Sequence, residues 1–180
     1  MSDPVCPVCS DTLPCACPKN AGADSRALRD AFGRFATGIT VVTALSPAGT
    51  PVGMTVNSFT SLSLEPPLLL WCLGRQAREA EAFRLASHHC INILAADQRE
   101  FSECFAGRNP DRFAGIAWQA GIGGAPVLSG CAAAFEVANE RQLDGGDHLI
   151  LIGRVLRHQA KPASEPLIYH AGRYARLIGD

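Results

Sequence analysis

The pattern of apolar and polar positions predicts a chain built mostly from strands. Runs of β-branched or apolar residues closed by glycine, proline or aspartate are typical of strands. Such runs occur at residues 38–45, 53–67, 68–73, 89–94, 131–143 and 148–160. The last two runs flank Asp144-Gly145-Gly146-Asp147, a sequence that favours a tight hairpin turn.

Helical spacing is found in three places. Ser25 can cap a first helix, and Gly38 is expected to end it. One face of this helix would carry Leu28, Ala31, Phe32 and Phe35. Residues 78–87 and the segment around 101–105 show the same spacing. Many strands with three helices and no regular alternation favour an α+β fold built on an antiparallel barrel over a parallel sheet.

The run at 148–156 is apolar at consecutive positions rather than at every second one. Strand side chains alternate between faces, so Leu149 and Ile150 point to opposite sides. Both faces of this strand are therefore expected to be covered. One cover is the barrel core, and the other is a partner subunit or a helix of the same chain.

Composition limits the classes of function. The chain has 180 residues, of which 47% are hydrophobic and 18% charged, and its net charge is -1. That balance gives no electrostatic footprint for nucleic acid or an anionic membrane. The apolar excess suits a subunit interface or a flat cofactor. No apolar run of about 18 residues and no secretory signal are found, so a cytoplasmic protein is expected.

The first residues differ from the rest. Residues 1–22 are rich in proline and carry four of the eight cysteines, Cys6, Cys9, Cys15 and Cys17. We interpret this segment as a flexible extension, followed by one domain over residues 23–180. Two other interpretations stay open: four thiolates are enough for tetrahedral zinc, and Cys6 and Cys9 could form a redox dithiol.

Three segments could carry chemistry. Residues 53–67 combine hydroxyl and amide side chains in one extended stretch, which suits the mixed polar edge of a flavin or pterin, although a partly exposed strand would look the same. The junction 73–78 places Arg75 and Arg78 at a helix start, which favours phosphate, unless both arginines pair with nearby glutamates. In 145–148, Asp147 could orient the imidazole of His148.

Together these segments resemble the short-chain flavin reductases, the reductase components of two-component flavin-dependent monooxygenases. The resemblance covers about residues 25–178. It rests on GRFATGITVVTA, GMTVNSFTSLSLEPPLLLWCL, INILAADQREFSECFAG, DRF, GDH and GRY, in that order.

The resemblance implies a homodimeric, FMN-binding split barrel of Greek-key type with flanking helices. It implies that NADH or NADPH reduces FMN or FAD, and that the reduced flavin passes to a partner oxygenase. The residues that would bind the flavin are Thr55, Val56, Asn57, Ser58, Ser61, Arg78 and Phe105. His148 would line the nicotinamide site as a positioning group or proton donor, with Tyr174 nearby.

The sequence is also compatible with other classes of function. The chain could keep its flavin bound and reduce another acceptor, such as a metal centre or a corrinoid. It could also bind flavin without catalysis, as a carrier or sensor. A metal-binding module centred on the cysteine-rich extension would leave the rest of the chain, more than 150 residues, unexplained.

Overall fold

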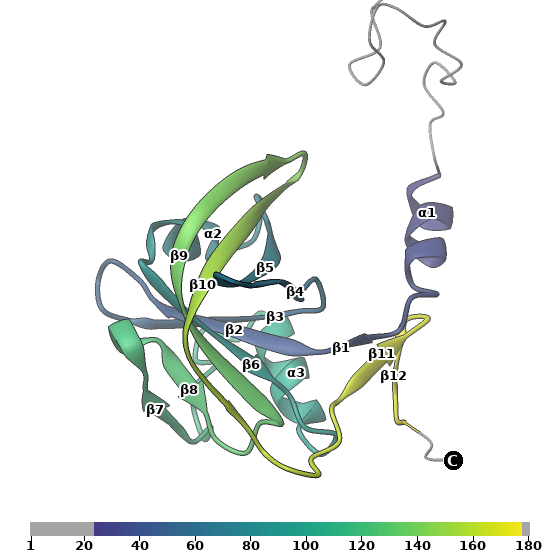
Figure 1. Cartoon of the computed structure of the whole chain (residues 1–180). Helices are drawn as coiled ribbons and strands as arrows, with labels where there is room; N and C mark the ends of the chain where they lie inside the picture. The colour runs from purple at the N-terminus through teal and green to yellow at the C-terminus, as the bar shows by residue number, and fades with distance from the viewer. Residues whose placement is uncertain (1–23, 178–180) are drawn as a thin grey trace, which may run out of the picture.

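The computed structural model describes residues 24–177 (Figure 1). Its helices are α1 (Ser25–Phe32), α2 (Ala80–Leu85), α3 (Arg99–Ala106) and the short 3-10 helix η1 (Ile122–Gly124). Its strands are β1 (Thr37–Gly38), β2 (Thr40–Leu45), β3 (Pro51–Val56), β4 (Thr60–Leu64), β5 (Pro67–Gly74), β6 (His88–Ile93), β7 (Trp118–Ala120), β8 (Pro126–Leu128), β9 (Ala133–Gly145), β10 (His148–Ala160), β11 (Ile168–His170) and β12 (Arg173–Ala175). The extension over residues 1–22, with its four cysteines, lies outside the described residues.

One large sheet organises the described part of the chain. It has seven strands in the order β3-β2-β6-β9-β10-β5-β4, and every pairing in it is antiparallel. A smaller sheet, β1-β11-β12, and the pair β7-β8 complete the strands. The expectation of mostly antiparallel strands with few helices is confirmed.

The core lies on both sides of the buried strand β2. On one side, Trp71 of β5 packs edge-on against Phe83 of α2 and against His89, all three with almost no exposed surface. On the other side, Phe105 of α3 packs with Val41 and Leu94. Burial of these apolar side chains fixes α2 and α3 against the sheet.

The longest strands, β9 and β10, form the expected hairpin. Gly145 pairs with His148, so the turn consists of Gly146 and Asp147 alone. Gly146 has a φ of 76°, a conformation that glycine adopts without strain. β10 also pairs with β5, and the register sets His148 opposite Gly74, the last residue of β5. Along β10, Leu149 and Leu151 face the core, while Ile150 and Ile152 on the opposite face are half-buried.

The first helix differs from its expected form. Asp24 rather than Ser25 is the N-cap, because its Oδ1 accepts a hydrogen bond from the Arg26 N–H at 2.9 Å. The helix ends at Phe32 instead of continuing to Gly38. The Gly33 carbonyl accepts from the Ala171 N–H at 2.8 Å, which ties the chain to the β11–β12 hairpin instead of to a further helical turn.

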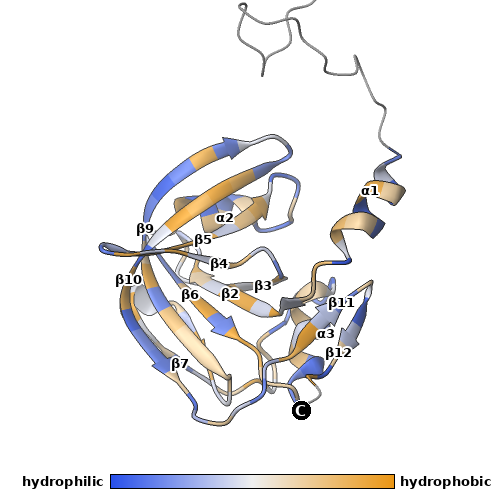
Figure 2. Cartoon of the chain, turned by 45° about the vertical axis from the view of Figure 1, so that its right-hand side comes forward, coloured by the Kyte–Doolittle hydropathy of each residue, from blue (hydrophilic) through white to orange (hydrophobic). Residues whose placement is uncertain are grey.

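Helix α1 stands apart from the sheet, and its apolar residues remain exposed (Figure 2). Phe32 is 70% exposed and Phe35, which follows the helix, is 79% exposed. Large apolar side chains left this exposed and close together in the sequence are typical of an interaction site.

Candidate functional site

Three of the residues expected at the flavin site line one cavity. Thr55 of β3, Arg78 just before α2, and Phe105 of α3 border a volume of about 450 Å³. The cavity is completed by Met54, Ala77, Glu79, Ala106, Gly107, Arg108 and Arg112. This size lies within the range of small-molecule sites.

Three arginines give this cavity a positive charge. The Arg78 side chain is exposed, and its Nη1 donates to the Arg108 carbonyl at 3.3 Å. The Arg112 side chain is only 10% exposed and forms an ion pair with Glu79 at 3.0 Å. One carboxylate therefore stands against three guanidinium groups. Helix α2 has six residues and starts only at Ala80, so the arginines rather than its dipole make the cavity favourable for an anion.

Arg112 also connects the walls of the cavity. Its Nη1 donates to the Gly53 carbonyl at 2.7 Å, and its Nη2 donates to the Gly107 carbonyl at 2.9 Å. With the Glu79 ion pair, one side chain holds β3, the end of α3 and the start of α2 together. Arg112 is a functional residue that was not predicted from the sequence. Its only signal was its place in the motif DRF.

Phe105 forms the floor of the cavity rather than an exposed stacking surface. It is 1% exposed and packs edge-on against Phe113 at 5.1 Å between ring centroids. Gly53 lies directly against it, since a Cβ at position 53 would come within 2.5 Å of the Phe105 ring. The absence of a side chain at residue 53 thus permits the close approach of β3 and α3.

The side chains of the polar segment that runs from the end of β3 into β4 make several different kinds of contact. Thr55 Oγ1 donates to the Ser102 carbonyl of α3 at 2.8 Å. Val56 packs against the core. The Ser58 hydroxyl is held by the backbone of Cys72, accepting from its N–H at 3.0 Å and donating to its carbonyl at 3.3 Å. Ser61 lies in β4, exposed and paired with Leu69. Ordinary strand packing and pairing thus account for some of the polar residues in this segment.

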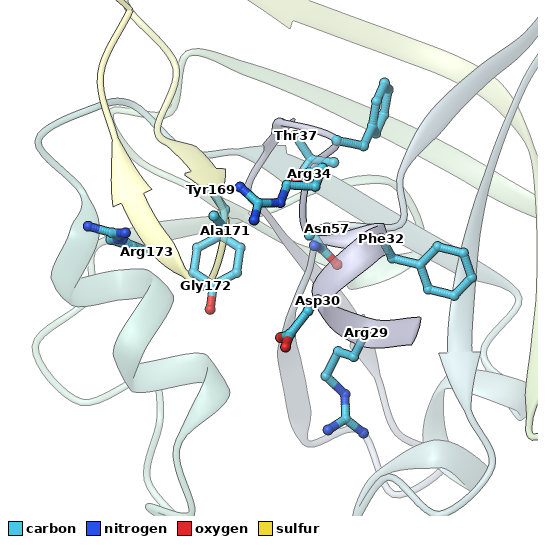
Figure 3. Close-up of a pocket in the computed structure, with 12 residues that line it drawn as sticks. Arg29, Asp30, Phe32, Arg34, Thr37, Asn57, Tyr169, Ala171, Gly172 and Arg173 are labelled. Atoms are coloured by element: carbon cyan, nitrogen blue, oxygen red, sulfur yellow. The ribbon is translucent and has the colours of Figure 1, made fainter. Parts of the chain in front are cut away.

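Asn57 is exposed and lines a second cavity of about 620 Å³, between α1 and the β11–β12 hairpin (Figure 3). Three arginines line it as well. Figure 3 shows the Arg34 side chain reaching toward Tyr169, whereas Arg29 and Arg173 point away from the centre. Asn57 is only two residues beyond Thr55, so the extended segment links this cavity to the first.

His148 borders a third cavity of about 310 Å³, together with Gly74, Arg75, Gln76, Ala77 and Asp147. Ala77 lines this cavity and the Arg78 cavity alike, so the two are neighbours. His148 Nδ1 lies 2.7 Å from the Asp147 carboxylate. A carboxylate can only accept, so Nδ1 carries the proton and Nε2 is the free ring nitrogen. The His148 hydrogen bond is the main cause that lowers the pKa of Asp147.

Arg75 does not pair with Glu79 or Glu81. Its Nη2 lies 2.8 Å from the Asp144 carboxylate at the hairpin tip. The hydrogen bond from Arg75 is the main cause that lowers the pKa of Asp144. Arg75 is therefore attached to the hairpin, and Arg78 is the arginine of this junction that lines the 450 Å³ cavity.

Tyr174 does not line the cavity that His148 borders. Its hydroxyl donates to Ser102 Oγ at 3.1 Å, and Arg99 lies over its ring at 4.6 Å. Tyr174 and Thr55 thus meet at the same residue of α3, next to the Arg78 cavity. Within residues 24–177, no group of three or more His, Cys, Asp or Glu side chains could hold a metal ion. No helix in that range is long and apolar enough to cross a membrane.

Comparison with known proteins identifies the family. The flavin reductase like domain matches residues 32–177, so the chain belongs to the flavin reductase family. It is 44% identical over 156 residues to the FMN reductase (NADH) SmoA of Agrobacterium fabrum, which covers 87% of this chain and 88% of that protein. It is 48% identical over 132 residues to the stachydrine N-demethylase reductase subunit Stc3 of Rhizobium meliloti.

That second match covers 73% of this chain. The chain spans 57% of that relative and 42% of a probable flavin reductase from the same organism. Among solved structures, the NADH:FAD oxidoreductase SgcE6 of Streptomyces globisporus, in complex with NAD and FAD fragments, is similar with a TM-score of 0.84 and 37% identity. That match covers 91% of this chain and 99% of SgcE6.

Proposed function

We propose that this chain is an NADH:flavin oxidoreductase that reduces FMN or FAD by hydride transfer. The observation that carries the proposal is the junction of two cavities at Ala77. One holds the arginines Arg78, Arg108 and Arg112, and the other is bordered by His148. The relatives named above support NADH as the hydride donor.

The residues present fit a flavin phosphate. Arg78 is exposed at the cavity wall, and Arg112, whose charge is paired with Glu79, holds that wall in place behind it. Charge-assisted bonds from arginine to phosphate are among the strongest polar contacts in proteins. In this proposal Arg78 binds the phosphate, and the extended segment from Thr55 to Ser58 lies along the isoalloxazine ring and the ribityl chain of the flavin. Because the Ser58 hydroxyl is held by Cys72, Ser58 contributes through its backbone.

The bound flavin would supply the hydride acceptor, and one proton from solvent balances the reaction that converts NADH to NAD⁺. The chain contributes binding and orientation, the usual share of the protein in cofactor chemistry. Asp147 fixes the imidazole of His148 with Nδ1–H directed at its carboxylate. Nε2 is then available to hold the nicotinamide or, when protonated, to donate a proton. Val56 supports the site by packing against the core, and Tyr174 does so by donating to Ser102 of α3, whereas the exposed Ser61 would meet the flavin from β4, outside both cavities.

We further infer a split barrel of Greek-key type that works as a homodimer. The curved seven-stranded sheet supports the barrel. The exposed apolar residues Leu28, Phe32 and Phe35 support the dimer, because a second copy would remove them from water. The reduced flavin would pass to a partner oxygenase; the relative Stc3 is likewise named as the reductase subunit of a larger enzyme, an N-demethylase.

The proposal is tested by flavin retention and turnover together. The full chain is mixed with excess FMN, passed over a desalting column and assayed for NADH oxidation with and without added FMN or FAD. A colourless protein that needs added flavin supports the proposal. A yellow protein that oxidises NADH only with another acceptor, such as a metal complex or a corrinoid, would contradict the proposal and indicate a flavoprotein that keeps its flavin bound. A yellow protein with no turnover would indicate a carrier.

A further inference from the structure

The tip of the β9–β10 hairpin is attached to β5 by one arginine. Arg75 Nη2 forms an ion pair with Asp144 at 2.8 Å, and Arg75 Nε donates to the Gly146 carbonyl at 2.9 Å. The Arg75 backbone N–H donates to the Asp147 carbonyl at 3.0 Å. These contacts reach three of the four residues that come directly before His148.

The tip depends on such contacts because little else covers it. Residues 141–148 are all exposed, and the hairpin extends beyond the neighbouring elements (Figure 1). The β10–β5 pairing ends at His148 and Gly74, so the turn itself lies beyond the ladder. Asp144 Oδ1 also accepts from the Gly146 N–H at 3.2 Å, which closes the tip into a small network around the Arg75 guanidinium.

We propose that Arg75 is a positioning residue that holds the turn before His148, and thereby directs the imidazole into the cavity beside Ala77. The role rests on the proposed function, because His148 matters for turnover only if that cavity receives the nicotinamide. Arg75 uses Nε and Nη2 on the hairpin, so it acts on the reaction through His148 and does not bind phosphate.

This role is separable from stability. The Arg75 side chain is 41% exposed and that of Asp144 is 79% exposed. Ion pairs at this exposure contribute little to folding and are weakened by salt. Loss of the Arg75 side chain should therefore leave the melting temperature nearly unchanged while it loosens the tip.

The first test needs no flavin. Hydrogen–deuterium exchange is measured at the amides of residues 145–148 in the full chain, in Arg75→Ala, and in Arg84→Ala as control. Arg84 also makes an exposed ion pair, with Glu81 at 2.7 Å, and its side chain is similarly exposed at 45%. We expect exchange in Arg75→Ala to be several times faster, while Arg84→Ala behaves as the wild type. Arg75→Lys, which keeps the charge but cannot form the fork, should fall between. Unchanged exchange in Arg75→Ala overturns the proposal.

The second test uses turnover. We expect kcat in Arg75→Ala to fall about tenfold, as for a misplaced reacting group, with the FMN dissociation constant within about twofold of the wild type. The double variant Arg75→Ala/His148→Ala should be no slower than His148→Ala alone. Faster exchange with unchanged kcat, or additive losses in the double variant, also overturns the proposal. If His148→Ala keeps full turnover, the proposed role of His148 fails, and the exchange data alone then decide whether Arg75 holds the turn.

Discussion

The ring of Phe105 lies directly over Gly53, so close that a Cβ at residue 53 would come within 2.5 Å of Cε1. The Gly53 carbonyl also accepts from Arg112 at 2.7 Å. One glycine thus sets both the floor and the wall of the cavity proposed for the flavin phosphate. Its role comes from close packing.

Gly53→Ala should therefore damage both stability and flavin binding. An added methyl group in a packed core costs about 1–3 kcal/mol, and here it would displace Phe105 and strain the Arg112 bond. We expect a lower melting temperature and weaker FMN binding, measured by thermal unfolding and fluorescence titration. Gly38→Ala is the control, because a Cβ at residue 38 meets nothing within 4 Å. Equal behaviour of the two variants would contradict this interpretation of Gly53.

Arg78→Ala should weaken FMN binding and leave riboflavin binding nearly unchanged. Removal of one charge-assisted hydrogen bond to phosphate corresponds to about tenfold or more in the dissociation constant. Riboflavin lacks the phosphate and serves as the internal comparison in the same titration. Arg84→Ala, an exposed arginine on α2, is the matched control. An equal loss for both ligands would show that Arg78 acts on the ring or on folding, and not on the phosphate.

His89→Gln should flatten the dependence of stability on pH. Burial is the main cause that lowers the pKa of His89 from 6.5 to about 4. The unfolded state therefore takes up a proton at a higher pH than the folded state, and stability falls as the pH decreases from about 6.5 to about 4. The full shift corresponds to about 3 kcal/mol.

The check is urea unfolding at several pH values in that range. The wild type should lose stability toward low pH, and the neutral Gln variant should lose less. Parallel curves would mean that His89 does not control acid sensitivity.

Much of the fold could be predicted because its signals are local. β-branched runs indicate β2 and β6, and the Asp144–Asp147 sequence indicates the hairpin turn, which the structure narrows to Gly146 and Asp147. The end of α1 could not be predicted, because it depends on the Gly33 carbonyl meeting the Ala171 N–H from the far end of the chain.

The residues of the candidate site also fall into those that could be predicted from local sequence and those that could not. Thr55 lies in a polar stretch and Arg78 in a basic one, and both patterns favour ligand binding. The structure brings the two residues to one cavity. The role of Arg112 could not be predicted from the sequence, because its partners Gly53, Glu79 and Gly107 come from three separate segments. The use of the Ser58 hydroxyl by Cys72 was hidden for the same reason.

Phe32→Asp combined with Phe35→Asp should convert the proposed homodimer to a monomer. Both side chains are largely exposed in the single chain, so charges there disturb an interface and not the core. Light scattering after gel filtration measures the mass. Arg26→Asp, also exposed on α1, is the control for the added charge. A wild-type chain that is already monomeric would contradict the dimer, as would a double variant that remains dimeric with an unchanged dissociation constant.

Anaerobic stopped-flow absorbance of the flavin band tests the central claim most directly. The full chain, equilibrated with FMN or FAD, is mixed with NADH, and the loss of flavin colour is followed over time. The proposed function predicts rapid bleaching, with a rate that saturates in NADH and is lower in His148→Ala. Flavin that binds but stays oxidised, or that bleaches no faster than in a mixture without protein, would contradict it.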